Sequence, residues 1–165
     1  MDAKFFPALE KLITQTLQLV TQLQQQLQRE TAVLNQFNQP ETLTEIALQK
    51  RQLVEDIESN YRILGQFLTQ QQLPNNQNGL LTCLRRAETN GMAIAVSLEN
   101  WQQLKLVASE CQALNEQNGA AIDLLSRQTQ RSLDILKGKP QTTDLYGPGG
   151  AARSISSTPR TLASV

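Results

Sequence analysis

The sequence contains no histidine, two cysteines and only 4% aromatic residues among 165 positions. Without histidine, Ser-His-Asp and Cys-His catalytic arrangements are excluded, and the commonest side-chain ligand of zinc and iron is missing. The net charge is zero and no stretch is rich in Lys or Arg, which argues against nucleic acid as a partner. The longest apolar runs, such as Met92–Val96, fall far short of the ~20 residues that cross a bilayer, so no membrane insertion is expected.

Other chemical equipment is also missing. The acidic residues are scattered singly along helical faces, and the sequence has neither a Gly-rich phosphate loop nor a paired cysteine motif. We therefore predict a protein that is not an enzyme and needs no cofactor or metal. The two lone cysteines, Cys83 and Cys111, favour a reducing compartment, and charged residues near the start interrupt any signal peptide. A cytoplasmic location is expected.

Leucine and glutamine dominate what is present, with 26 Leu and 23 Gln. Both are good helix formers, whereas the β-branched and aromatic residues that strands favour are sparse. Apolar residues recur at alternating steps of four and three, the seam of a coiled coil. They predict an all-α fold, an antiparallel bundle or coiled coil of three long helices over residues 3–37, 43–67 and 92–137, plus one short helix over residues 80–87.

Turn residues separate these segments. The break at residues 38–40 is so short that the first two helices must form an antiparallel hairpin. Further breaks lie at residues 73–79, 90–91 and 138–140. Residues 1–138 are therefore expected to form a helical bundle domain. Residues 139–165, rich in Gly, Pro, Ser and Thr, are expected to form a flexible, disordered tail.

Three polar residues, Glu30, Lys50 and Asn118, interrupt the apolar seams where leucine would be expected. When the hairpin is folded, Glu30 and Lys50 reach about the same level, and Asn118 follows if the last helix runs back along the second. We predict a buried polar layer that fixes helix register. The alternative is that each side chain tips outward at the seam edge. A mid-helix glycine, Gly119, suggests that another backbone packs closely there.

Several short patterns together resemble the FlgN-type flagellar export chaperones. The matching residues, in chain order, are Leu27, Glu30, Val33 and Leu34, then Ala47, Lys50, Leu53 and Ile57, then Leu114, Asn115, Asn118, Gly119 and Ile122, and finally Leu145-Tyr146-Gly147-Pro148, Gly150 and Arg160–Ser164. The resemblance covers nearly the whole chain. It implies a small cytoplasmic bundle that binds hook–filament junction proteins of the FlgK/FlgL type through their C-terminal helical segments. The client would thereby stay competent for the flagellar type III export apparatus.

The predicted helix lengths suggest where a client would bind. The last predicted helix exceeds the second by ~24 Å, so it should outrun the hairpin from about residue 124. Its apolar stripe would then lack a full intramolecular partner and offer a groove for an amphipathic helix. The expected client-binding residues are Ile122, Leu125, Thr129, Leu133, Ile135 and Leu136. The short helix, or a second copy of the chain in a homodimer, are the alternatives for covering this stripe.

Tyr146 is the only aromatic residue after Trp101 and lies in the predicted tail. We interpret it as a docking motif for the export apparatus, and the alternative is an idle linker residue. The competing function for the whole chain is a self-associating coiled-coil scaffold without a transient client.

Overall fold

The computed structural model describes residues 5–36 and 40–137, which contain four α-helices and no strand. These are α1 (Phe5–Leu34), α2 (Pro40–Gln70), α3 (Gln77–Thr89) and α4 (Ala95–Leu136). Within the described residues, the predicted all-helical architecture of three long helices and one short helix is confirmed, with bounds that differ by a few residues from those predicted. The predicted tail, residues 139–165, lies outside the described residues.

Local capping explains where the helices begin and end. Pro40 opens α2, a position where its missing N–H is no loss. Asn76 precedes α3 in an extended conformation, and its side-chain oxygen accepts a 3.0 Å hydrogen bond from the Gly79 N–H. After α3, Gly91 adopts a positive φ of 81°, which favours glycine and ends the helix. The short helix is therefore separate from α4.

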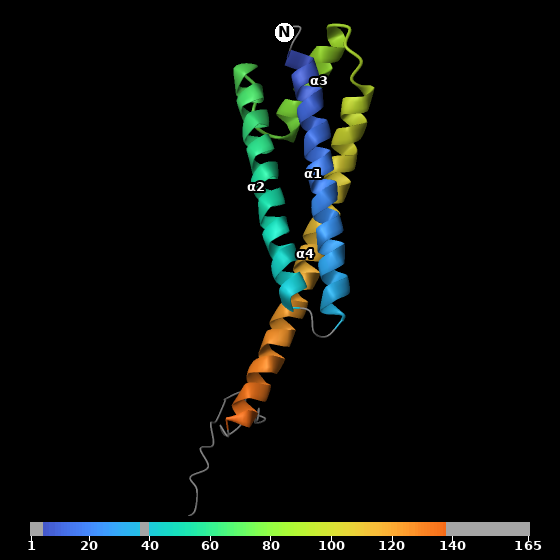
Figure 1. The fold of residues 1–165 in the computed structure, drawn as a ribbon. Helices are drawn as coiled ribbons and strands as arrows, with labels where there is room; N and C mark the ends of the chain where they lie inside the picture. Colours follow the sequence, from blue (N-terminus) through green and yellow to red (C-terminus); the bar gives the residue numbers. More distant parts are fainter. Residues whose placement is uncertain (1–4, 37–39, 138–165) are drawn as a thin grey trace, which may run out of the picture. The chain divides into compact units, whose positions relative to one another are not determined.

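The chain divides into two compact units, Met1–Ile122 and Asp123–Val165. Within the first unit, α2 runs antiparallel to α1, as the short connection between them predicts (Figure 1). Residues 95–122 of α4 run in the same direction as α1 and lie along it (Figure 1). The described part of the second unit is the rest of α4 and Lys137.

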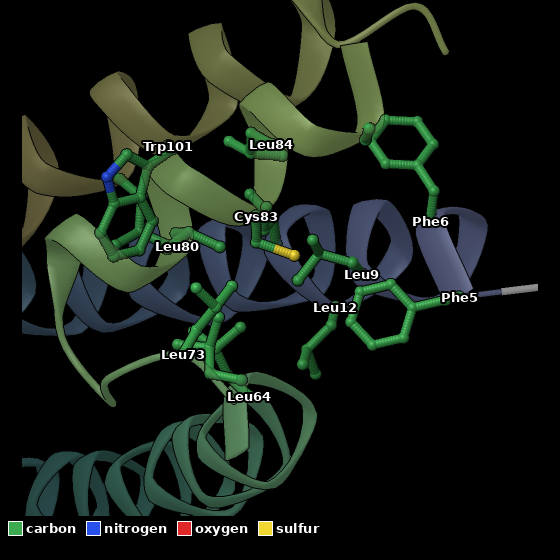
Figure 2. Close-up of a cluster of buried hydrophobic side chains, with 14 residues drawn as sticks. Phe5, Phe6, Leu9, Leu12, Leu64, Leu73, Leu80, Cys83, Leu84 and Trp101 are labelled. Atoms are coloured by element: carbon green, nitrogen blue, oxygen red, sulfur yellow. The ribbon is translucent and has the colours of Figure 1, made fainter. Parts of the chain in front are cut away.

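The main core lies at the end of the first unit where α3 is found. Side chains from all four helices meet there, including Leu9 of α1, Leu68 of α2, Cys83 of α3 and Leu104 of α4. Figure 2 shows Phe5 and Phe6 at one end of this cluster and Trp101 at the other. The amphipathic face of α3 thus covers the three long helices at this end, which keeps their apolar stripes from water.

A smaller cluster continues the core along α1 and α4. Val20 and Leu27 of α1 are buried with Val107 and Cys111 of α4, and Ile57 of α2 packs against them. The seams that the sequence predicts for α1 and α4 therefore face each other.

The expectation that another backbone packs against Gly119 is wrong. A Cβ built on Gly119 meets nothing within 4 Å. At Gly79 an added Cβ would lie 1.9 Å from the backbone carbonyl oxygen of Pro74, whereas at Gly65 it would meet the side chain of Asn75 at 2.6 Å. The tight turn that leads into α3, rather than the packing of α4, requires a glycine.

Candidate functional site

The structure brings Glu30, Lys50 and Asn118 together in one hydrogen-bonded group inside the first unit. The Lys50 Nζ donates to a Glu30 carboxylate oxygen at 2.6 Å, and the Asn118 Nδ2 donates to the same oxygen at 2.8 Å. Glu30 is 4% exposed and Asn118 is 2% exposed, whereas the Lys50 side chain keeps 19% of its surface in contact with solvent. We call these three residues the polar layer.

Asn118 uses both ends of its amide in this position. Its Nδ2 also donates to the Leu27 carbonyl oxygen at 2.9 Å, and its Oδ1 accepts from the Thr31 hydroxyl at 2.8 Å. Asn118 of α4 is thereby hydrogen-bonded to three groups of α1: the Leu27 carbonyl, the Glu30 carboxylate and the Thr31 hydroxyl. Lys50 links α2 to the same Glu30 carboxylate. Since a buried ion pair and its hydrogen bonds are satisfied in one alignment only, this arrangement can fix helix register.

An apolar groove lies beside the polar layer, and its lining belongs entirely to the first unit. It has a volume of about 520 Å³. Leu23 and Leu27 of α1 contribute to its lining, and one side is formed by α4 residues that include Cys111 and Asn115. Along α2 the lining residues are Ala47, Lys50, Arg51, Val54, Glu55 and Glu58.

This groove is not among the features predicted from the sequence. The signal was present, because Ala47, Arg51, Val54 and Glu58 follow steps of four, three and four and so share a second face of α2. Two of those four positions carry charge, so in the sequence this face of α2 resembles an ordinary solvated surface. Only the positions of α2 and α4 in the structure show that this face borders the apolar groove.

The residues predicted to bind a client all lie on α4, on either side of the division between the units. Ile122, the last residue of the first unit, is 43% exposed. In the second unit, Leu125 is half-buried, and Thr129, Leu133, Ile135 and Leu136 are exposed. Their role in binding stays a prediction. Tyr146 lies outside the described residues, so its docking role also stays a prediction.

Both thiols are in buried, apolar positions. Burial raises the pKa of the Cys83 thiol, although nearby Arg86 acts in the opposite direction. Burial also raises the pKa of the Cys111 thiol, and the charge of Glu110 adds to the effect. Both are therefore neutral thiols at pH 7, which suits packing rather than nucleophilic chemistry.

Two absences within the described residues bear on function. They contain no group of three or more Cys, Asp or Glu residues placed to hold a metal ion. In the same part of the chain, every helix is too short or too polar to cross a bilayer. Neither observation identifies a function by itself.

Comparison with known proteins identifies the chain through its family. A family model described as FlgN protein matches residues 1–154, which is most of the 165-residue chain. No curated protein and no solved structure matches it. With nearly its whole length covered by that family model, the chain belongs to the FlgN family of flagellar export chaperones.

Proposed function

We propose that this protein is a cytoplasmic chaperone that binds hook–filament junction proteins of the FlgK/FlgL type through their C-terminal helical segments. The observation that carries this proposal is the match to the FlgN family over residues 1–154, since chaperones of this family bind flagellar export substrates. A folded helical surface without cofactor chemistry suits such a role, because a chaperone needs to shield its client rather than alter it.

The exposed apolar stripe of α4 is the proposed client-binding surface. At ~100° per residue, Ile122, Leu125, Thr129, Leu133 and Leu136 follow one face of the helix. Ile135 lies about 120° around the helix from the middle of this face, so it belongs to the predicted client-binding residues but is not used in the test below. Leu136 is 83% exposed, and burying such side chains against a client helix would remove them from water.

Co-expression with full-length candidate clients, followed by pull-down and size-exclusion chromatography, tests this function. A defined complex with a FlgK/FlgL-type protein is expected, and it should be lost when the client lacks its C-terminal helical segment. Leu133→Asp should weaken binding about tenfold or more, since a charge would be buried at the interface. The matched control is Leu124→Asp, because Leu124 is an exposed leucine on the other side of the same helix.

Two results would contradict the proposal. One is that no candidate client forms a complex with the wild-type protein. The other is a stable self-assembly of the chain that buries the α4 stripe, which would favour a self-associating scaffold. A homodimer that dissociates when the client is added would instead agree with the proposal.

The flagellar export apparatus is the second proposed partner, with Tyr146 as its contact. Tyr146→Ala should leave client binding intact and reduce client secretion. Tyr146→Phe is the matched control, because it keeps the aromatic ring and removes only the hydroxyl. Unchanged secretion by the alanine variant would contradict this role.

A further inference from the structure

The short helix α3 fills only part of a space that the three long helices leave open. At one end of the first unit, its buried residues Leu80, Cys83, Leu84 and Ala87 pack against α1, α2 and α4. Further along, the same three long helices line the apolar groove, and no residue of α3 reaches it. A fourth helix is therefore present at one end of this unit and missing at the groove.

An apolar partner could cover the groove without burying an unpaired charge beside the polar layer. Lys50 contributes to the lining, but its ammonium group already donates to buried Glu30. Asn118 satisfies the same carboxylate from α4. Covering this region thus leaves no buried charge without a partner, and Leu23, Ala47 and Val54 supply apolar contacts.

The charged residues at the rim have a defined order. Arg51, Glu55 and Glu58 are exposed, and none forms an ion pair with another described residue. Arg51 lies nearer the α1–α2 connection and Glu58 nearer α3, about 10 Å or two helical turns apart at ~1.5 Å per residue. Only a helix with charges of opposite order would complement both ends of this rim.

We propose that the groove binds an amphipathic helix of the client protein, about three turns long. Its apolar stripe would face Leu23, Ala47 and Val54. A basic residue would face Glu55 and Glu58, and an acidic residue two turns away would face Arg51. This inference rests on the proposed chaperone function and adds a second client surface, distinct from the α4 stripe.

The chain's own C-terminal segment is a poor candidate for this groove. A helix of three turns needs about 11 residues. Glycine and proline recur through residues 138–165, and no run of that length is free of them. A separate protein is therefore the better source of the helix.

Affinity measurements with matched variants test the proposal. The probes are labelled synthetic peptides that span the C-terminal helical segments of the FlgK/FlgL-type proteins, titrated by fluorescence anisotropy into the full chain. Val54→Asp should weaken binding about tenfold or more, because the new carboxylate would lie in the apolar contact. Ile63→Asp is the control, since Ile63 is also β-branched, lies on α2 and is 41% exposed like Val54, but does not line the groove.

Charge reversal tests whether the order of the charged residues along the groove sets the orientation of the bound helix. Glu58→Lys should weaken a peptide about two- to fivefold at low salt, and reversing the facing basic residue of the peptide should restore the affinity. A photoreactive residue at position 54 should cross-link to the peptide. Cross-linking at that position to residues 138–165, or to a second copy of the chain, would overturn the proposal.

The outcomes separate this proposal from the chaperone function. Peptide binding that is lost in Leu133→Asp and unchanged in Val54→Asp would overturn the groove and leave the function standing. Failure of the wild-type chain to bind both these peptides and the full-length clients would overturn the proposed function itself.

Discussion

Asn118 of α4 donates a 2.8 Å hydrogen bond to a carboxylate oxygen of Glu30 on α1, and both residues are almost fully buried. The same oxygen accepts from Lys50 of α2. A carboxylate removed from water therefore depends on one cation and one amide from two other helices. Because partial loss of such a group leaves a charge without compensation, the polar layer should be highly sensitive to single substitutions.

Lys50→Met should lower the free energy of unfolding by about 3–5 kcal/mol, because Glu30 would stay buried without its cation. Urea denaturation followed by Trp101 fluorescence measures this loss. The double variant Glu30→Leu with Lys50→Met should recover much of the stability, because it removes both charges. A loss of only a few tenths of a kcal/mol in the single variant would indicate that Glu30 gains little from Lys50.

The ion pair between Arg29 and Glu45 is the matched control within the chain. Its N–O distance is 4.0 Å, and the two side chains are 47% and 57% exposed. An exposed pair of this kind contributes about 0–1 kcal/mol. Arg29→Met should therefore change the free energy of unfolding much less than Lys50→Met, and equal losses would contradict this ranking.

Asn118→Asp should place a second carboxylate beside Glu30 with almost no change in shape. The like charge raises the pKa of the new carboxyl group in the folded state above its unfolded value, so the folded protein binds more protons. The stability deficit relative to wild type should therefore be large at pH 7 and shrink as the pH falls toward 4. Paired urea titrations at several pH values measure it, and a deficit independent of pH would argue against close contact with Glu30.

Much of the helical layout can be predicted from the sequence because helix-breaking residues clearly separate the apolar repeats. Pro40 and the residues around Gly79 and Gly91 interrupt the apolar repeats where helices end or begin. The meeting of Glu30, Lys50 and Asn118 could also be anticipated, since a regular rise per residue converts sequence distance into axial level. Where a helix has one clear apolar face, the apolar repeat alone is sufficient to predict which residues face the neighbouring helices.

Other features could not be read from the same patterns. The groove depends on how far α2 and α4 lie apart, and periodicity contains no information on that separation. The second face of α2 mixes Ala47 and Val54 with Arg51 and Glu58, so its apolar character is hidden. The expectation of close packing at Gly119 was wrong because a helical glycine can be tolerated on an exposed face without any close neighbour.

The two glycines Gly79 and Gly119 should respond in opposite ways to alanine. At Gly79 the added Cβ would meet the Pro74 carbonyl oxygen at 1.9 Å, so the turn before α3 must shift and the protein should lose about 1–3 kcal/mol. At Gly119 the space is open, so alanine should stabilise α4 by up to about 1 kcal/mol. Thermal melts of the two variants measure both changes, and destabilisation by Gly119→Ala would show that a partner packs there.

The buried thiols of Cys83 and Cys111 should make the fold less stable in alkali. Burial is the larger cause of the raised pKa of each thiol, so the unfolded chain releases these protons at lower pH than the folded chain does. The contribution of the thiols to stability is therefore fully present below the unfolded thiol pKa of about 8.5, and it is lost as the pH rises through the folded-state pKa.

A double variant tests this pH dependence. Cys83→Ala with Cys111→Ala should start from a lower stability, because it leaves small cavities, but lose less stability between pH 7.5 and pH 9.5. Urea titrations at the two pH values compare the slopes, and equal slopes in both proteins would mean that the thiols titrate alike in the folded and unfolded chains.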